Sequence, residues 1–142
     1  MITFGPMRIA ILGPAWPYRG GIAAFNERLA REIQSRGDTV RIYTYTLQYP
    51  SFLFPGKTQR SESPRPDDLD IVECINSINP LNWLAVRRKL SRWKADKVVV
   101  PFWQPLMAPS LAFIAKGGER IGLLHNLLPH EKKPGSEFLA RL

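Results

Sequence analysis

The sequence predicts an α/β protein built on a Rossmann-like, mostly parallel sheet of about five strands with flanking helices. Short β-branched and aliphatic runs alternate along the chain with stretches of helical periodicity. Strands separated by crossover helices pair in parallel. The length of 142 residues suits a single domain, and an apolar fraction of 44% is ordinary for a globular protein.

The first two strands flank one amphipathic helix. Residues 8–12 (RIAIL) form a short apolar run that Gly13 and Pro14 end, and residues 39–46 are rich in β-branched and aromatic side chains. Between them, residues 22–36 repeat with a helical period, and Gly37 is a typical C-terminal stop. We expect the apolar face of this helix to consist of Ile22, Phe25, Leu29 and Ile33.

The middle of the chain combines a long loop with a second strand–helix unit. Residues 47–68 contain four prolines and predict a loop whose length is usual for functional or mobile segments. Residues 70–74 predict the third strand, and Asn79-Pro80 supplies an N-cap followed by proline at the first helical position. This helix continues to about Trp93, and its expected apolar side consists of Leu81, Leu84, Val86, Leu90 and Trp93.

The last third of the chain predicts two more strands. Residues 97–102 (KVVVPF) are almost uniformly apolar and therefore predict a central strand. A short helix over 109–116 and a turn at Gly117-Gly118 lead to the fifth strand, residues 121–124. Residues 125–142 form a polar loop that enters a helix at about Ser136, and we interpret the abrupt end inside it as a truncation of a longer chain.

Ligands of parallel α/β sheets bind outside the carboxyl ends of the strands, which here are the loops after Leu12, Phe102 and Leu124. In the first of these loops, Arg19, Gly20 and Gly21 open directly into a helix. Paired glycines let a ligand approach the backbone, and the helix N-terminus offers free N–H groups to an anion. A tight turn without a ligand is the simpler alternative.

Several common sites are excluded by their missing residues. The Gly-x-Gly-x-x-Gly dinucleotide fingerprint is absent, and Gly56-Lys57-Thr58 lacks the upstream glycine and strand of a phosphate-binding P-loop. No Gly-x-Ser-x-Gly motif accompanies the single Cys74, which belongs to a predicted buried strand. Two histidines with one adjacent glutamate match no common metal site, so we expect no metal and no cofactor.

A few side chains near the ligand edge remain candidates for chemistry. His125 and Asn126 follow the fifth strand, where the imidazole is suited to act as a base, bind a sugar hydroxyl or balance phosphate charge. An ordinary hydrogen-bonding loop histidine is the alternative. Trp103 follows the fourth strand and is suited to stack on a sugar or to pack in the core, whereas Trp16 and Tyr18 lie in the first loop and are better candidates for acceptor contact.

The chain is basic, with a net charge of +8. Such a balance is typical of proteins that bind nucleic acid, anionic membranes or nucleotide diphosphates, and a solvated basic face explains it equally well. No aromatic-basic platform supports nucleic acid, and no apolar run reaches the roughly 18 residues that span a membrane. Most of the clustered cations belong to the second helix: Arg87, Arg88, Lys89, Arg92, Lys94 and Lys97.

Taken in order, these motifs resemble the opening of retaining group 1 (family-four type) glycosyltransferases, which have the GT-B fold of two facing Rossmann-like domains. The resemblance rests on residues 8–14, on Gly20-Gly21-Ile22, on residues 29–40, and on the two later strands, the second of which ends at His125 and Asn126. It covers most of residues 7–131, and its weight comes from the order and spacing of the motifs.

The resemblance implies that residues 1–142 are the N-terminal, acceptor-side domain of a cytoplasmic hexosyltransferase of carbohydrate biosynthesis. The full enzyme would transfer a sugar from a nucleotide-sugar donor to an unknown acceptor, with retention and without a metal. Arg19, Gly20, Gly21 and Asn126 would then face the donor, and His125 would assist catalysis. The donor-nucleotide site would belong to a C-terminal domain that this chain lacks.

The resemblance also implies a membrane-docking surface on the basic helix. Arg87, Arg88, Lys89 and Arg92 resemble the surface by which some such enzymes bind the anionic inner membrane peripherally. The alternative to the whole interpretation is a non-catalytic Rossmann-like module that captures an anionic ligand or membrane surface through Gly20-Gly21 and this helix.

Overall fold

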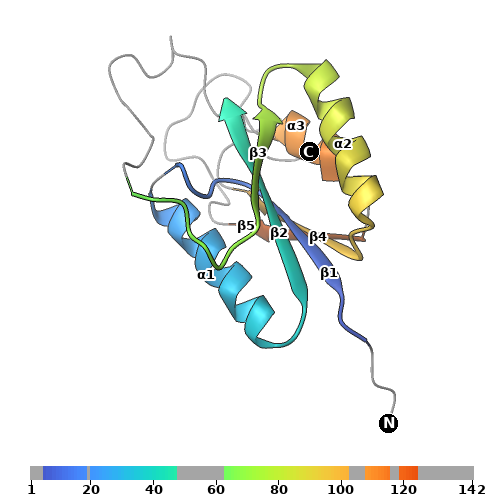
Figure 1. Cartoon of the computed structure of the whole chain (residues 1–142). Coiled ribbons are helices and arrows are strands. Elements are labelled where there is room, and N and C mark those ends of the chain that lie inside the picture. The colour runs from blue at the N-terminus through green and yellow to red at the C-terminus, as the bar shows by residue number, and fades with distance from the viewer. Residues whose placement is uncertain (1–4, 19, 48–62, 103–107, 116–118, 125–142) are drawn as a thin grey trace.

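The computed structural model describes residues 5–18, 20–47, 63–102, 108–115 and 119–124 (Figure 1). Its five strands form one all-parallel sheet in the order β3-β2-β1-β4-β5, flanked by three helices. The elements are β1 (Arg8–Leu12), α1 (Gly21–Ser35), β2 (Thr39–Leu47), β3 (Ile71–Asn76), α2 (Pro80–Trp93), β4 (Lys97–Phe102), α3 (Ala108–Ile114) and β5 (Glu119–Leu124). The predicted Rossmann-like α/β fold is confirmed.

β4 is an interior strand of the sheet, as its apolar run predicted, and the middle strand is β1. β1 pairs with β2 on one side and with β4 on the other, and β4 in turn lies between β1 and β5. An interior strand is covered on both faces, so its side chains are apolar on either face, and Val98 and Val99 are both buried.

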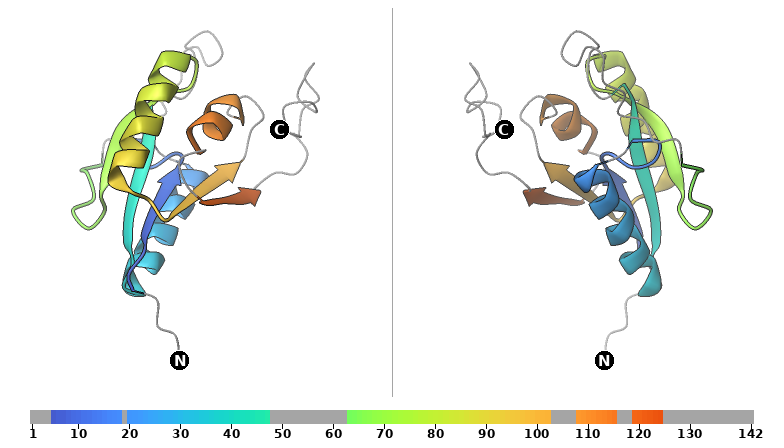
Figure 2. Two further views of the ribbon diagram at one scale, coloured as in Figure 1. Left: turned by 90° about the vertical axis from the view of Figure 1, so that its right-hand side faces the viewer. Right: turned by 90° about the vertical axis from the view of Figure 1, so that its left-hand side faces the viewer.

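Alternate side chains of each strand pack on opposite faces of the sheet. One face carries Ala10 and Leu12 of β1, and is covered by α2 and α3. The other carries Ile9 and Ile11 of β1, and is covered by α1 (Figure 2). Because both faces are buried, the described part of the molecule has three layers, with the sheet between α1 on one side and α2 and α3 on the other.

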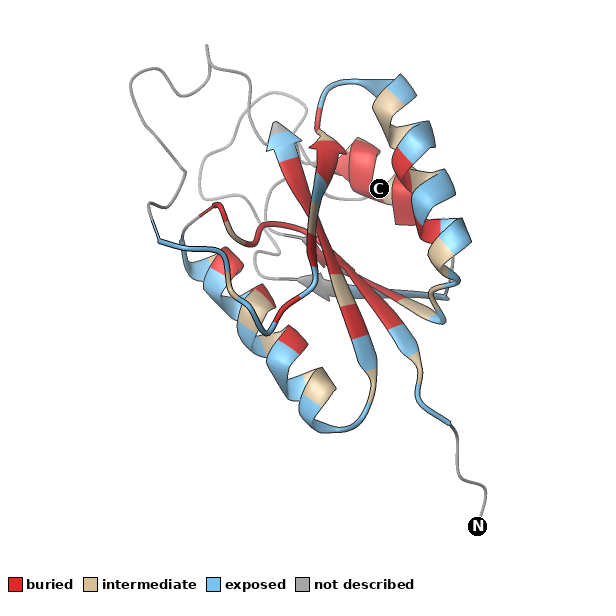
Figure 3. Cartoon of the chain, in the orientation of Figure 1, coloured by how far each residue is buried: buried red, intermediate tan, exposed pale blue. Residues whose placement is uncertain are grey.

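The face of α1 that packs on the sheet differs from the predicted one. Its buried residues are Ala23, Asn26 and Ala30, while Leu29 and Ile33 are only partly buried (Figure 3). Phe25, expected in the apolar face, is 41% exposed. Small side chains let the helix approach the sheet closely, so the larger apolar residues lie at the margins of the contact.

The apolar side of α2 is also narrower than predicted. Val86 and Leu90 are buried and Trp93 is partly buried, which agrees with the expectation. Leu81 and Leu84, however, face away from the sheet and are 80% and 38% exposed. The helix therefore carries aliphatic side chains on its outer surface as well as on its inner one.

The structure describes the end of the predicted 47–68 loop. Leu47 belongs to β2, residues 48–62 lie outside the described residues, and residues 63–70 form a segment that runs beside α1. Arg31 of α1 binds Asp68 at 2.6 Å, and Gln34 donates to the Asp68 carbonyl. This segment, called the 63–70 strap below, is therefore tied to α1 before it enters β3.

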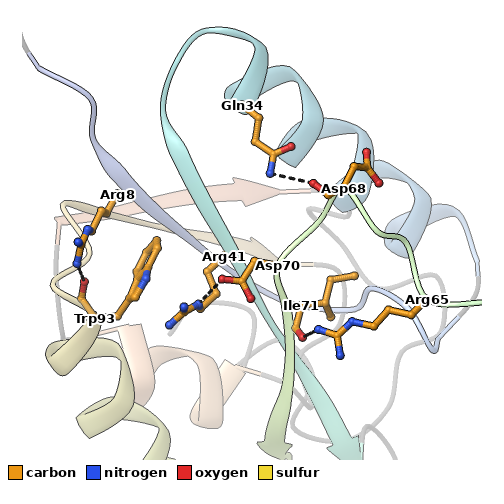
Figure 4. A network of polar contacts seen from close by, with 8 residues as sticks. All are labelled: Arg8, Gln34, Arg41, Arg65, Asp68, Asp70, Ile71 and Trp93. Atoms are coloured by element: carbon orange, nitrogen blue, oxygen red, sulfur yellow. Dashed lines mark hydrogen bonds and ion pairs between the residues drawn. The ribbon is translucent and has the colours of Figure 1, made fainter.

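A second group of polar contacts joins the strap to the sheet (Figure 4). Arg41 of β2 binds Asp70 at 2.7 Å, and its guanidinium lies 4.9 Å from the centre of the Trp93 ring. Arg8 donates to the Trp93 carbonyl, and its guanidinium lies 5.8 Å from the centre of the same Trp93 ring. Arg65 donates to the Ile71 carbonyl. These contacts fix the start of β3 and the end of α2.

Candidate ligand-binding edge of the sheet

The strand order creates a topological switch point between β1 and β4. From β1 the chain proceeds outward through β2 and β3, then returns to the other side of β1 as β4 and β5. The loops after Leu12, Phe102 and Leu124 therefore follow three adjacent strands at one edge of the sheet. This adjacency is the arrangement in which such folds form a ligand crevice.

The loop after β1 is held by hydrogen bonds to two elements, β2 and α1. The Gly13 N–H donates to the Tyr43 carbonyl at 3.1 Å, and the Ala15 N–H donates to Thr44 Oγ1 at 3.1 Å. From α1, the Asn26 side chain donates to the Pro14 carbonyl at 2.9 Å, and Glu27 accepts from the Trp16 N–H at 3.2 Å. The loop is thus preorganised before any ligand arrives.

Gly13 lies closest to the switch point and has no room for a side chain. A Cβ at this position would meet the Asn26 amide nitrogen at 3.0 Å and Pro101 of β4 at 3.5 Å. The glycine is therefore required by close packing between the loop, α1 and β4. It is a structural residue of this edge.

Gly20 and Gly21 form the entry to α1, as predicted. Gly20 is the N-cap residue with φ 129° and ψ 175°, a conformation that is essentially restricted to glycine. Both glycines are exposed, and a Cβ on either would meet nothing within 4 Å. As a glycine, Gly20 has no side chain to accept a hydrogen bond from the first-turn N–H groups, and the first turn has no acidic residue.

The turn from β3 into α2 has the opposite character. Asn79 caps α2 by accepting from the Leu81 N–H at 3.0 Å, and Pro80 at the first helical position has no N–H. Asn82 accepts from the Asn76 N–H and donates to the Cys74 carbonyl, at 2.7 and 2.8 Å. The polar groups of this turn therefore satisfy one another.

Trp16 and Tyr18, the first-loop aromatic residues predicted to contact the sugar acceptor, differ in solvent exposure. Tyr18 is only 8% exposed, because its ring packs edge-on against Tyr45 in the core under α2 and α3. The expectation that loop aromatics stay accessible therefore fails for Tyr18. Trp16 is half-buried; its indole N–H donates to the Ser63 carbonyl at 2.7 Å, and Arg65 lies over its ring. Trp16 connects the loop to the strap and keeps part of its surface exposed.

The remaining predicted site residues, Arg19, Trp103, His125 and Asn126, lie outside the described residues. By sequence, His125 is the residue after the last position of β5, and Trp103 is the residue after the last position of β4. Their proposed roles stay predictions.

The single cysteine of the chain is a core residue, as predicted. Cys74 is buried in β3, and burial raises the pKa of its thiol to about 11. A thiol held protonated in this way is a poor nucleophile at neutral pH. Among the residues that the structure describes, no three His, Cys, Asp or Glu side chains gather as a metal site.

Asn26 is the residue of this edge that sequence reasoning missed. It is fully buried in α1, and its Oδ1 has no hydrogen-bond partner among the described residues. The sequence contains a signal for this role, because Ala23, Asn26 and Ala30 recur at helical spacing and form a row of side chains smaller than the apolar residues around them. A polar residue in that series marks the place where the helix contacts the loop backbone.

The cationic side chains of α2 differ in burial. Arg87 is half-buried and its guanidinium lies 5.3 Å from the centre of the Phe113 ring of α3. Arg88, Lys89 and Arg92 are exposed. No helix of the described residues is long and apolar enough to cross a membrane.

In comparisons with known proteins, no family model and no curated protein matches this chain.

Proposed function

We propose that this chain is the acceptor-side domain of a glycosyltransferase that uses a nucleotide-sugar donor and retains the anomeric configuration. The observation that carries the proposal is the strand order: the Gly20-Gly21 loop, the end of β4 and the position of His125 after β5 all belong to adjacent strands β1, β4 and β5. The resemblance of the sequence motifs to group 1 glycosyltransferases supplies the reaction class.

The turn into α1 is suited to the diphosphate of such a donor. The first-turn N–H groups point out of an exposed helix N-terminus, where the helix dipole favours an anion. The absence of side chains at Gly20 and Gly21 lets phosphate oxygens approach the backbone. The hydrogen bonds of Asn26 and Glu27 to the preceding loop hold these groups in place without touching the ligand.

The roles of the other candidates follow from the resemblance. We propose that His125 contacts the transferred sugar or assists its departure, and that Arg19 and Asn126 contribute to donor binding. Trp16 and Trp103 remain candidates for contact with the acceptor. The ring of Tyr18 is buried against Tyr45 and anchors the loop to the core. Most donor affinity would come from a second α/β domain, and the enzyme would act in the cytoplasm.

A complete protein that includes the second domain tests this proposal. We expect it to release nucleoside diphosphate from one member of a panel of nucleotide sugars when an acceptor is supplied. The variant His125→Ala should lower the turnover rate about a hundredfold or more while its melting temperature stays near that of the wild type. Equal losses of stability and turnover would instead assign His125 a structural role.

A non-catalytic module that binds an anionic ligand is the second candidate, and the uncapped, glycine-flanked N-terminus of α1 favours it equally. Calorimetry of this chain alone separates the two. Weak binding of nucleotide sugars agrees with a transferase whose donor site lies mainly in another domain, whereas tight binding by residues 1–142 supports the module.

A further inference from the structure

The 63–70 strap consists of two parts that differ in how they are anchored. The second part, residues 67–70, begins with a turn and contains Leu69, which is 6% exposed in the core under α1. Asp68 forms an ion pair with α1, and Asp70 forms one with β2. The Asp70 carbonyl also accepts from a backbone N–H of β2 at 2.9 Å. A buried side chain, two ion pairs and a backbone hydrogen bond therefore hold this part.

The first part of the strap, residues 63–66, has no buried side chain. Figure 3 shows this stretch beside α1 as mostly exposed. Pro64 and Pro66 have no backbone N–H, so half of its residues cannot donate a backbone hydrogen bond. Exposed polar contacts that bury no apolar surface stabilise a segment only weakly. The first part is therefore held less firmly than the second.

Trp16 of the first loop lies under this weakly held part. Its indole N–H donates to the Ser63 carbonyl at 2.7 Å, and the Arg65 guanidinium lies 5.9 Å from the centre of its ring. Arg65 also donates to the Ile71 carbonyl (Figure 4). Trp16 itself is fixed by packing against the core under α1 and by its backbone N–H, which donates to Glu27. The strap thus occupies the indole N–H and the ring, the two groups by which a tryptophan binds a sugar.

We propose that residues 63–66 form a cover that detaches from Trp16 by a hinge at the turn 67–68 and so opens a carbohydrate-binding position of the acceptor site. This inference rests on the function proposed above. With the cover detached, the indole N–H donates to an acceptor hydroxyl, and the ring surface left by Arg65 stacks on a sugar ring. The fraction of molecules with an open cover then sets the apparent affinity for the acceptor.

Trp83 of α2 provides a matched control for the contact of Trp16. Both tryptophans are half-buried, and the Trp83 indole N–H donates to the Asn76 carbonyl at the same distance of 2.7 Å. Asn76, however, is the last residue of β3, and its N–H is bound by Asn82 at 2.7 Å. The two indole hydrogen bonds therefore differ mainly in how firmly their acceptors are held.

Solvent exchange of the indole N–H signals, measured by NMR on the full chain, tests whether the cover opens. The variants Trp16→Phe and Trp83→Phe assign the two signals. In the wild type, the Trp16 indole N–H should exchange at least about tenfold faster than that of Trp83, because only the cover has to open. Exchange at Trp16 as slow as at Trp83 would overturn the proposal.

The variant Arg65→Gln tests the contact that closes the cover. It should raise the exchange rate of the Trp16 indole N–H about threefold or more, since it removes an exposed cation–π contact. The backbone N–H of Leu69 should keep its wild-type rate, because the second part of the strap stays in place. Arg28→Gln, which removes the same charge from an exposed position of α1, should change neither rate. An unchanged rate at Trp16 in Arg65→Gln, or an equal increase at Leu69, would contradict the hinged cover.

The link to the acceptor is tested in the complete protein. Arg65→Gln should lower the acceptor KM by the same factor by which it speeds exchange at Trp16, and leave the donor KM unchanged. An acceptor KM that stays the same or rises, in a variant with faster exchange, would overturn the acceptor role of the covered position. If the complete protein transfers no sugar, this role falls with the proposed function, while the exchange rates still decide whether the cover opens.

Discussion

The turn from β1 into α1 and the turn from β3 into α2 lie at the same edge of the sheet, but they use their polar groups differently. At α2, Asn79 caps the helix and Asn82 binds the backbone of Cys74 and Asn76 at the carboxyl end of β3. At α1, the helix starts at two exposed glycines without a side-chain cap. The start of α2 is capped by a side chain of the protein, whereas the start of α1 has no side-chain cap for its first N–H groups.

Stability and ligand access are therefore assigned to different residues of the β1–α1 turn. Asn26, Glu27 and Thr44 hold the loop by hydrogen bonds to its backbone. The loop is therefore fixed without any side chain at Gly20 and Gly21. A helix N-terminus that is held rigidly and remains uncapped binds an anion without an ordering cost. In the β3–α2 turn, by contrast, the asparagine side chains themselves make the stabilising hydrogen bonds.

The largest stability effect is expected at the β3–α2 turn. Asn82→Ala removes two hydrogen bonds and leaves the Asn76 N–H and the Cys74 carbonyl without their partner. We expect a loss of about 2 kcal/mol in the free energy of unfolding, measured with urea. The exposed residue Arg88, in the same helix, serves as the control, since Arg88→Ala should change stability by less than about 0.5 kcal/mol. A change of that small size in Asn82→Ala would refute the assigned role.

The two glycines of the β1–α1 turn should respond differently to alanine. Gly20→Ala forces a side chain into a conformation with φ 129° and should cost about 1.5 kcal/mol. Gly21→Ala places a methyl group in open space at the start of a helix and should be neutral or slightly stabilising. Urea unfolding of both variants provides the comparison, and a larger loss in Gly21→Ala would contradict it.

Removal of the α2 cap should have a smaller effect. Asn79→Ala loses the hydrogen bond to the Leu81 N–H, and we expect a loss of about 1 kcal/mol. Asn79→Asp keeps an acceptor at the cap and should restore most of this stability. If Asn79→Asp is as unstable as Asn79→Ala, the side-chain cap does not explain the effect.

The smallest effect is expected at the ion pair that ties the strap to α1. The hydrogen bond from Arg31 lowers the pKa of the Asp68 carboxyl below its ordinary value. Unfolded Asp68 therefore binds its proton at a higher pH, so the pair stabilises the fold above the ordinary aspartate pKa, and this contribution disappears as the pH falls through the lowered pKa. Asp68→Asn should be slightly less stable than the wild type at neutral pH, and the difference should vanish in acid.

Urea unfolding at neutral and at strongly acidic pH measures this difference. Because both side chains are largely exposed, salt should weaken the effect as well. A stability difference of unchanged size in acid would contradict the assignment of the effect to the charge of Asp68.

Sequence periodicity predicted the strands and helices because their local signals agree with the fold. The run of residues 8–12, the Asn79-Pro80 helix start and the stop at Gly37, which has φ 97°, depend only on neighbouring residues. The position of β4 in the sheet and the burial of Tyr18 depend on partners far along the chain, such as β5 and Tyr45. No local pattern contains that information.

The candidate edge was predictable in outline for the same reason. The loop after Leu12 and its glycines follow from the strand–helix boundary, whereas the hydrogen bonds of Asn26 and Glu27 to that loop depend on how α1 lies on the sheet. The strap contact between Trp16 and Ser63 joins residues far apart in the sequence, and it was not foreseen.

We propose that the uncapped turn at Gly20 and Gly21 binds the diphosphate of a nucleotide-sugar donor. The most direct test is nucleoside diphosphate release by the complete protein carrying Gly21→Val, with Gly21→Ala as the smaller substitution. A Cβ at this position has open space around it, so we expect a normal melting temperature together with a loss of turnover of about a hundredfold for valine. Wild-type turnover by the folded Gly21→Val variant would contradict the claim.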